Sequence, residues 1–210
     1  MSVVISVLNQ KGGSGKTTLA TNIAMGLFRQ GAKVLLCDTD PQGSARDWRA
    51  ASEMNPITVV GFDRPTLARD LSSVGSGYDV VVVDGAPQLK ELATAAIKAS
   101  DAVIIPVQPS PYDVWATSDL VELIKTRQEV TDGKLQAAFV VSRAIQNTRL
   151  SKDVFEALSH YSLEVFNSHT CQRVSYASTA AEGKTVFDSE DDKVCREISL
   201  IIEEMMQWVN

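Results

Sequence analysis

The feature that most constrains how this chain folds is the glycine-rich stretch QKGGSGKTT at residues 10–18. It follows an apolar run at residues 3–8 and precedes a helix-like stretch at residues 19–29. When a strand runs through such a turn into a helix, several backbone N–H groups and the positive end of the helix dipole point at one place. This arrangement suits a polyphosphate, so we predict a phosphate loop between a strand and a helix.

The residue types in this loop match different parts of a nucleotide. Its glycines let the backbone approach the phosphates without obstruction by side chains. Lys16 supplies a positive charge to the β- and γ-phosphates, and Thr17 offers a hydroxyl group to Mg²⁺. The predicted nucleotide-binding set in the loop is Lys11, Gly12, Gly13, Ser14, Gly15, Lys16, Thr17 and Thr18. The expected ligand is a nucleoside triphosphate with Mg²⁺, and the alternative is a glycine-rich turn with incidental lysines.

The loop departs from the usual pattern G-x-x-x-x-G-K-[ST] at its first position, where this chain has Gln10 instead of glycine. It also carries a second lysine, Lys11, at its front. In these respects it resembles the deviant phosphate loop of the ParA/MinD ATPases. In that family the front lysine reaches across a dimer interface to the partner's nucleotide. The resemblance therefore implies that the nucleotide is ATP and that Lys11, like Lys16, has a catalytic role.

The rest of the chain alternates short β-branched apolar runs with amphipathic stretches, which is typical of a parallel sheet with helices on both faces. Strands are expected at residues 3–8, 34–39, 57–61, 80–84, 102–107 and 136–142, with a late edge strand at 163–166. Helices are expected after most strands, including residues 116–130, 151–161 and 193–208. The chain has 210 residues, 44% of them hydrophobic, and shows no repeat or convincing linker. We predict one P-loop NTPase domain, residues 1–210, of the α/β class: a doubly wound, mainly parallel sheet flanked by helices.

Acidic residues follow two of these strands, at the edge where open α/β sheets bind ligands. Asp84 ends the run YDVVVVD and is interpreted as the acid that holds Mg²⁺ through a water; a turn residue is the alternative. The stretch DTDPQ at residues 38–42 resembles the family's switch motif. The resemblance implies that Asp38 contacts the Mg²⁺ water shell and that Asp40 orients or deprotonates the attacking water. The sequence also allows Asp40 to cap a helix before Pro41.

Two later segments are candidates for the base end of the nucleotide. Residues 106–113, PVQPSPYD, contain three prolines, which predicts a stiff, extended loop, with Asp113 or Thr117 capping the next helix. In the family the corresponding loop lies near the nucleotide base and the dimer interface, so Pro109 is added to the predicted nucleotide-binding residues. A purely structural role of the prolines in shaping the loop explains the segment almost as well. Arg143, at a strand end, has a planar guanidinium that could stack on adenine, or face DNA or solvent.

The net charge of −6 argues, on its face, against a nucleic-acid-binding protein. Residues 143–184 nevertheless carry five basic against four acidic side chains, whereas residues 185–210 carry two against seven. Arg173 and residues 177–186 resemble the family's C-terminal region, where basic side chains on the assembled dimer form a sequence-independent DNA surface. The candidate DNA contacts are Arg149, Lys152, Arg173 and Lys184. For each of them a solvated surface charge is the alternative.

Other classes of site have little support in the sequence. The cysteines, Cys37, Cys171 and Cys195, lie far apart without a C-x-x-C pair, which argues against a disulfide, zinc or iron–sulfur site. No apolar run approaches the roughly 18 residues of a membrane span. The predicted terminal helix carries Glu197, Glu203 and Glu204 on its polar face, which anionic lipid would repel. We therefore expect a cytoplasmic protein that does not bind a membrane.

The motifs occur in family order along the whole chain, which looks most similar to the short ParF-like plasmid partition ATPases. The resemblance implies a DNA partition ATPase whose Mg-ATP sandwich homodimer binds DNA nonspecifically, so that this form is associated with the nucleoid; assembly beyond the dimer is left open. Slow hydrolysis, stimulated by a centromere-binding partition protein of the ParB or ParG kind, would release the DNA. The alternatives are a MinD-like membrane-associated positioner and a positioner of protein compartments. A metabolic ligase or a metal-cluster carrier on the same scaffold lacks the inserted loops or paired cysteines it would need.

Overall fold

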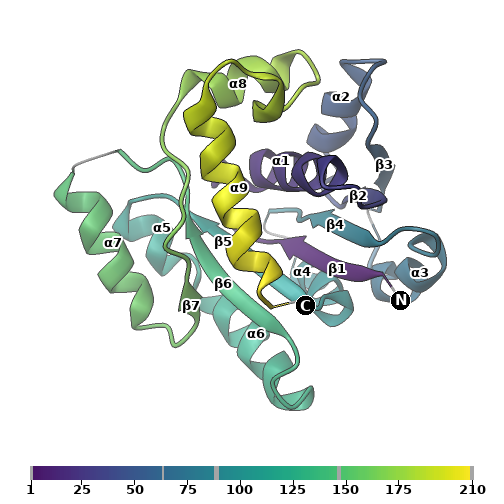
Figure 1. The fold of residues 1–210 in the computed structure, drawn as a ribbon. Coiled ribbons are helices and arrows are strands. Elements are labelled where there is room, and N and C mark those ends of the chain that lie inside the picture. The colour runs from purple at the N-terminus through teal and green to yellow at the C-terminus, as the bar shows by residue number, and fades with distance from the viewer. Residues whose placement is uncertain (1, 63, 88–89, 146–147, 209–210) are drawn as a thin grey trace.

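The computed structural model describes residues 2–62, 64–87, 90–145 and 148–208, which are organised around one parallel sheet (Figure 1). Its seven strands lie in the order β3-β2-β4-β1-β5-β6-β7. They are β1 Val3–Val7, β2 Val34–Asp38, β3 Thr58–Gly61, β4 Val80–Asp84, β5 Ala102–Val107, β6 Gln136–Val141 and β7 Glu164–Val165. Because β1 pairs with both β4 and β5, the loop that follows β1 lies over the middle of the sheet.

Helices cover both faces of this sheet. They are α1 Lys16–Arg29, α2 Ser44–Ala50, α3 Leu67–Val74, α4 Lys90–Ala99, α5 Pro111–Trp115, α6 Ser118–Val130, α7 Arg149–Ser159, α8 Val174–Ala181 and α9 Asp192–Met206, with a short 3₁₀ helix, η1, at Val186–Asp188. Figure 1 shows α1 and α9 packed together across one face. The other face is covered by α3, α4 and α6.

Alternation along the strands explains the two layers. In β2, Val34 and Leu36 belong to the core that contains α1 and α9, whereas Leu35 and Cys37 belong to the core under α3, α4 and α6. Successive side chains of a strand point to opposite faces, so a strand covered on both faces is apolar at consecutive positions. Full burial of each Val or Leu side chain stabilises the fold by roughly 1.5–3 kcal/mol.

The predicted fold class is confirmed by this sheet, and β4 and β5 have the predicted bounds. The other strands differ from the prediction by one residue at one or both ends. The prediction of an extended loop at residues 106–113 is wrong at both ends. Pro106 lies within β5, beyond the last residue that pairs with β1, and Pro111 is the first residue of α5, where the missing N–H of proline costs nothing.

The register of the sheet brings the predicted acids together. Asp38 and Asp84 are directly opposite each other at the carboxyl ends of β2 and β4, and Val7 of β1 is opposite Asp84. The phosphate loop leaves β1 at the same edge. Segments that are distant in the sequence therefore meet at the carboxyl edge of the sheet, where ligands of open α/β sheets bind.

Candidate nucleotide-binding site

The predicted phosphate loop has a shape that the protein's own hydrogen bonds fix. Gly13 and Gly15 have positive φ angles of 74° and 100°, which residues with a side chain rarely adopt. The Ser142 hydroxyl donates to the Ser14 carbonyl at 2.6 Å. The Gln108 amide donates to the Gly13 carbonyl, also at 2.6 Å. The Ser14 hydroxyl oxygen itself is buried and has no hydrogen-bond partner among the described residues, as expected of a group that awaits a ligand.

Lys16 begins α1, and its ammonium group lies against the loop. Its Nζ atom donates to the Lys11 carbonyl at 2.9 Å. Burial lowers the pKa of Lys16, and the nearby carboxylates of Asp84 and Asp40 oppose this effect without cancelling it. A polyphosphate in the loop would add negative charge beside this buried ammonium group. The position of Lys16 therefore suits the predicted phosphate contact.

Asp84 is buried at the end of β4 and has one unsatisfied oxygen. Its Oδ2 atom accepts a hydrogen bond from the Thr17 hydroxyl at 2.7 Å, whereas its Oδ1 atom has no hydrogen-bond partner among the described residues. Burial raises the pKa of Asp84 to about 7. Mg²⁺ is bound in proteins by oxygen atoms from one or two side chains together with waters and phosphates. A carboxylate oxygen without a donor, beside a threonine hydroxyl, fits this ion, and Thr17 and Asp84 are the residues that would hold it.

The carboxylate of Asp38 is used by the protein itself. Its Oδ1 atom accepts a hydrogen bond from the backbone N–H of Asp40 at 3.0 Å. Its Oδ2 atom accepts from the backbone N–H groups of Ala45 and Arg46, both at 3.1 Å. These N–H groups belong to the first turn of α2, so Asp38 caps that helix and its charge complements the helix dipole. The sequence allowed a capping role for Asp40, but the structure gives that role to Asp38; the contact of Asp38 with the Mg²⁺ water shell stays a prediction.

Asp40 lies in the loop between β2 and α2, the predicted switch loop, and is half-buried. Its carboxylate accepts a hydrogen bond from the backbone N–H of Gln42 at 2.9 Å. Arg46 reaches back from α2, pairs with the Asp38 carboxylate at 3.4 Å, and donates to the carbonyls of Asp40 and Pro41 at 3.0 and 3.4 Å. The guanidinium of Arg46 thus ties α2 to the switch loop. The catalytic role of Asp40 stays a prediction.

Lys11 is held at the front of the loop by an acid that the sequence did not identify as a site residue. Its Nζ atom forms an ion pair with Asp113 Oδ2 at 2.5 Å. The side chain of Asp113 is 7% exposed, whereas that of Lys11 is 38% exposed. Asp113 therefore pairs with the loop lysine instead of capping a helix, and the Thr117 hydroxyl donates to the Val114 carbonyl. The contact of Lys11 with a second copy stays a prediction.

A cavity of about 590 Å³ opens beside the loop, on the β6 side. Its lining includes Gly15 and Thr18 from the loop and α1, together with Gln108, Arg143 and Arg173. The volume lies in the range of small-molecule sites. The predicted Pro109 is not among the described lining residues; its neighbour Gln108 lines the cavity from the segment after β5. The cavity adjoins the phosphate loop and is lined by Arg143, the residue predicted to stack on adenine, so it is the candidate site for the base and ribose of the nucleotide.

The candidate DNA contacts do not form a set of unpaired basic groups. Three of them are paired with carboxylates: Arg149 with Asp153 at 3.7 Å, Arg173 with Glu197 at 2.8 Å, and Lys184 with Glu182 at 2.6 Å. The side chain of Lys152 lies outside the described residues. Figure 1 shows α7, which carries Arg149, well apart from α8, which follows Arg173. Arg173 lines the cavity, so we leave it out of the proposed DNA surface.

Several residues that shape the site escaped sequence reasoning. Gln108, Ser142, Asp113 and Arg46 act through partners that are distant in the sequence or that only the folded loop reveals. Asn9 offered the clearest signal, because a buried polar residue that directly follows an apolar strand needs partners. Its side-chain amide donates to the Pro106 carbonyl at 2.7 Å, and its side-chain carbonyl accepts from the backbone N–H of Lys11 at 2.9 Å. Asn9 thus fastens the front of the phosphate loop to β5.

Comparison with known proteins places this site in a family. A family model described as an AAA domain matches residues 2–55 and 50–137. The chain is 31% identical over 208 residues to the maintenance of carboxysome distribution protein A (McdA) of Halothiobacillus neapolitanus, covering 96% of this chain and 95% of that protein. It is 30% identical over 218 residues to the chromosome-partitioning ATPase Soj of Thermus thermophilus, covering 87% and 86%.

Solved structures share the fold. The apo structure of Cyanothece McdA has a TM-score of 0.82 at 17% identity and covers 98% of this chain and 100% of that one. The ATP complex of a variant of Cyanothece McdA has a TM-score of 0.77 at 16% identity and covers 98% and 96%. Among the described residues of this chain, no helix combines the length and apolar character needed to cross a membrane. From its family match and its sequence relatives, this chain belongs to the ParA-type family of P-loop ATPases.

Proposed function

We propose that this chain is an ATP-hydrolysing switch that positions a cargo, with Mg-ATP closing a homodimer and hydrolysis opening it. The observation that carries the proposal is the meeting of Lys16, Thr17 and Asp84 at a phosphate loop that presents a second lysine, Lys11. Lys16, Thr17 and Asp84 account for nucleotide and Mg²⁺ binding within one chain. The additional, partly exposed lysine supports a nucleotide site that a second copy completes.

The proposed chemistry assigns each residue a positioning task. The loop's N–H groups and Lys16 bind the phosphates, and Thr17 and Asp84 hold the metal. Bound Mg²⁺ would neutralise charge that develops on the β- and γ-phosphates. Asp40 orients the attacking water. These tasks suffice because phosphoryl transfer passes through a loose transition state that depends on alignment and charge more than on a strong base.

The proposed matrix is nonspecific DNA, and the stimulating partner is a cargo-bound protein. The relative Soj, whose name describes chromosome partitioning, supports DNA as the cargo. For that cargo we propose a centromere-binding partition protein of the ParB or ParG kind as the partner. A second candidate cargo is a protein compartment. It is favoured by McdA of H. neapolitanus, whose name describes carboxysome distribution and whose match covers 96% of this chain. The partner that raises ATP turnover would distinguish the two cargoes.

The test of the proposed function is nucleotide-dependent DNA binding by the Asp40→Ala protein, which should bind ATP without hydrolysing it. Fluorescence anisotropy of a random-sequence duplex would be measured in Mg-ATP and in Mg-ADP. Binding only in Mg-ATP is expected, because only that state should form the dimer. If neither state binds the duplex, anionic liposomes of phosphatidylglycerol are tested next, and binding to them would replace the DNA matrix with a membrane.

A further inference from the structure

One wall of the cavity is formed by residues 170–173, the end of an irregular segment, residues 167–173, that runs beside the end of β6. The backbone N–H of Ala144 donates to the Thr170 carbonyl at 2.8 Å, and that of Gln172 donates to the Ala144 carbonyl at 3.0 Å. The Thr170 hydroxyl accepts from the backbone N–H of Arg143 at 3.1 Å. One edge of this segment is therefore attached to the residues directly after β6, which also contribute Arg143 to the cavity.

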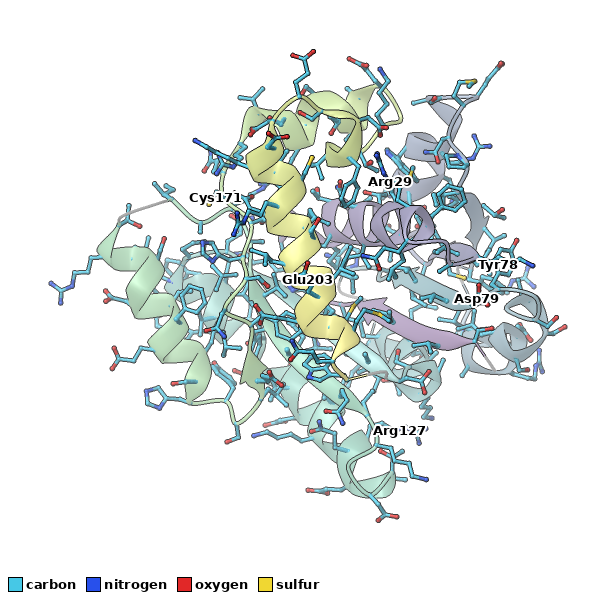
Figure 2. The ribbon with its side chains drawn as sticks, viewed as in Figure 1. Arg29, Tyr78, Asp79, Arg127, Cys171 and Glu203 are labelled. Carbon is cyan, nitrogen blue, oxygen red and sulfur yellow. The ribbon has the colours of Figure 1, made fainter. Side chains whose placement is uncertain are left out.

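The other edge of the segment is held, at the residues that line the cavity, by the carboxylate of Glu197 on α9. Glu197 Oε2 accepts from the backbone N–H of Cys171 at 3.0 Å and from the Tyr176 hydroxyl at 2.7 Å. Glu197 Oε1 accepts from Arg173 Nε at 2.8 Å. All three donors belong to residues that line the cavity. Figure 2 shows Cys171 beside α9, whose buried face packs into the core.

The bond to Glu197 fixes the direction of Arg173. The side chain of Arg173 is 20% exposed and that of Glu197 is 13% exposed, so the pair is largely shielded from water. The hydrogen bond to Glu197 raises the pKa of Arg173. Nε is engaged, whereas the two terminal nitrogens have no hydrogen-bond partner among the described residues. A guanidinium held in this way offers a planar, always charged group to the cavity.

A second glutamate of α9, Glu204, also anchors the segment but does so away from the cavity. Glu204 lies two helical turns beyond Glu197, on the same face of α9. Its carboxylate accepts from the backbone N–H groups of Asn167 and Ser168 at 3.0 and 2.7 Å. Neither of these residues lines the cavity. Glu197 and Glu204 thus perform the same kind of anchoring on one segment, but only Glu197 contacts the cavity wall.

We propose that Glu197 is a positioning residue for the nucleoside end of the nucleotide: it holds Arg173, Tyr176 and the backbone of Cys171 in the shape that the base and ribose require. This role rests on the proposed function, because it takes the cavity as part of the ATP site. It makes α9, the last helix of the described chain, a determinant of nucleotide affinity, acting through residues 171–176 and not through the phosphate loop. If Glu197 only stabilised the fold, its removal would weaken the binding of a nucleotide and of a bare polyphosphate by the same factor.

The experiment compares two probes by isothermal titration calorimetry: Mg-ADP, which has a nucleoside, and Mg-tripolyphosphate, which does not. Glu197→Ala should raise the Kd of Mg-ADP about tenfold, the effect expected when one charge-assisted hydrogen bond is misplaced, and leave the Kd of Mg-tripolyphosphate unchanged. Arg173→Ala should have the same effect. The double variant should be no weaker than either single one, because the two residues act as a unit. Equal weakening for both probes, or no weakening for Mg-ADP, would overturn the proposal.

Two controls keep the result interpretable. Glu204→Ala removes the same kind of anchor and should change neither Kd, and Glu203→Ala, at an exposed position of the same helix (Figure 2), should behave like the parent chain. If Glu197→Ala does not fold, Glu197→Gln retains the acceptor for Cys171 and removes the ion pair with Arg173, so it should still weaken Mg-ADP selectively. A parent chain that binds neither probe would refute the proposed function itself, whereas selective weakening by Glu204→Ala would overturn only the role of Glu197.

Discussion

At the scale of single residues, the main conflict in the site is the buried carboxylate of Asp84. One of its oxygens has no donor among the described residues, and burial raises its pKa to about 7. An acid whose pKa is higher in the folded than in the unfolded protein binds protons more tightly when folded. Its ionisation therefore destabilises the folded state as pH rises from the ordinary value toward the raised one. The ligand-free protein should lose stability through Asp84 between about pH 4 and pH 7.

We predict that Asp84→Asn removes this pH dependence. Relative to the Asn variant, the parent chain should lose about 2–3 kcal/mol of unfolding free energy between pH 5 and pH 8, because only the parent carries an ionisable group there. Urea unfolding at the two pH values measures the difference. Asp84→Asn should also lose the stabilisation that Mg-ADP gives the parent chain. A pH dependence shared by both proteins would show that Asp84 is not the group responsible.

The ion pair between Lys11 and Asp113 leads to a second prediction. A lysine that pairs with an acid of its own chain must leave that acid before it can contact another chain's nucleotide. Asp113→Asn should therefore increase the dimer fraction in Mg-ATP at a given protein concentration, as measured by light scattering. Asp119→Asn is the matched control, since Asp119 is exposed and lines the same surface hollow as Lys11. An unchanged dimer fraction in Asp113→Asn would show that the pair does not compete with assembly.

Residue types and spacing were enough to predict that Lys16, Thr17 and Asp84 meet, because a parallel sheet brings the ends of its strands to one edge. They were not enough to decide which acid caps α2. Asp38 and Asp40 are two residues apart, and only the path of the switch loop determines which one reaches the first turn of the helix. The partner of Lys11 could not be predicted either, because Asp113 is 102 residues away in the sequence.

At the scale of secondary structure, α2 and the switch loop act as one unit. Arg46 contacts the Asp38 carboxylate and the carbonyls of Asp40 and Pro41, so it connects the helix to both ends of the D-x-D-P stretch. Because α2 is only seven residues long, its position depends on such contacts more than on its own helix-forming tendency. The orientation of Asp40 should therefore depend on Arg46.

We predict that Arg46→Ala loosens the switch loop and lowers the kcat of ATP hydrolysis more than it weakens nucleotide binding. The amides of Gln42 and Gly43 should exchange with solvent faster, as read by hydrogen–deuterium exchange. Arg49→Ala is the matched control, because Arg49 lies on the same helix but donates to the Ser52 and Ile57 carbonyls, beyond the switch loop. Equal exchange rates in the parent and in Arg46→Ala would contradict this coupling.

The inner strands β2, β4, β5 and β6 could be predicted closely because each is a largely apolar run that is buried along most of its length. The short helices could not. α2 is preceded by a glycine with a positive φ angle and takes its capping carboxylate from the end of a strand, and α8 has no buried residue to give it an apolar stripe. The helix α5 was missed because the prolines predicted an extended loop there, although proline is also common at the first position of a helix. A helix or strand can be predicted from local sequence only when its apolar pattern and its capping residues lie within that stretch of sequence.

At the scale of the whole molecule, a net charge of −6 repels DNA, so any DNA contact must come from a local surface. Of the described candidates, Arg149 is the most accessible, with a side chain that is 93% exposed on α7 and that pairs with Asp153 one turn away. Surface ion pairs of this kind are weak and are readily exchanged for another anion. Arg149 is therefore available to a DNA phosphate, whereas Arg173 is committed to Glu197.

We predict that DNA binding in Mg-ATP falls steeply with salt and varies little with sequence, because neutralising each phosphate releases counterions. If Arg149 of each chain neutralises one phosphate, Arg149→Gln should lower the slope of log affinity against log salt by about 1 per chain. Arg69→Gln is the matched control, because Arg69 is 80% exposed, pairs with Asp70, and lies on α3. Anisotropy of a fluorescent duplex between roughly 50 and 200 mM salt, where electrostatic binding to DNA weakens most visibly, would measure both slopes. Equal slopes for the two variants would place the DNA surface elsewhere than α7, and a slope near zero in the parent chain would remove electrostatic DNA binding from the proposed cycle.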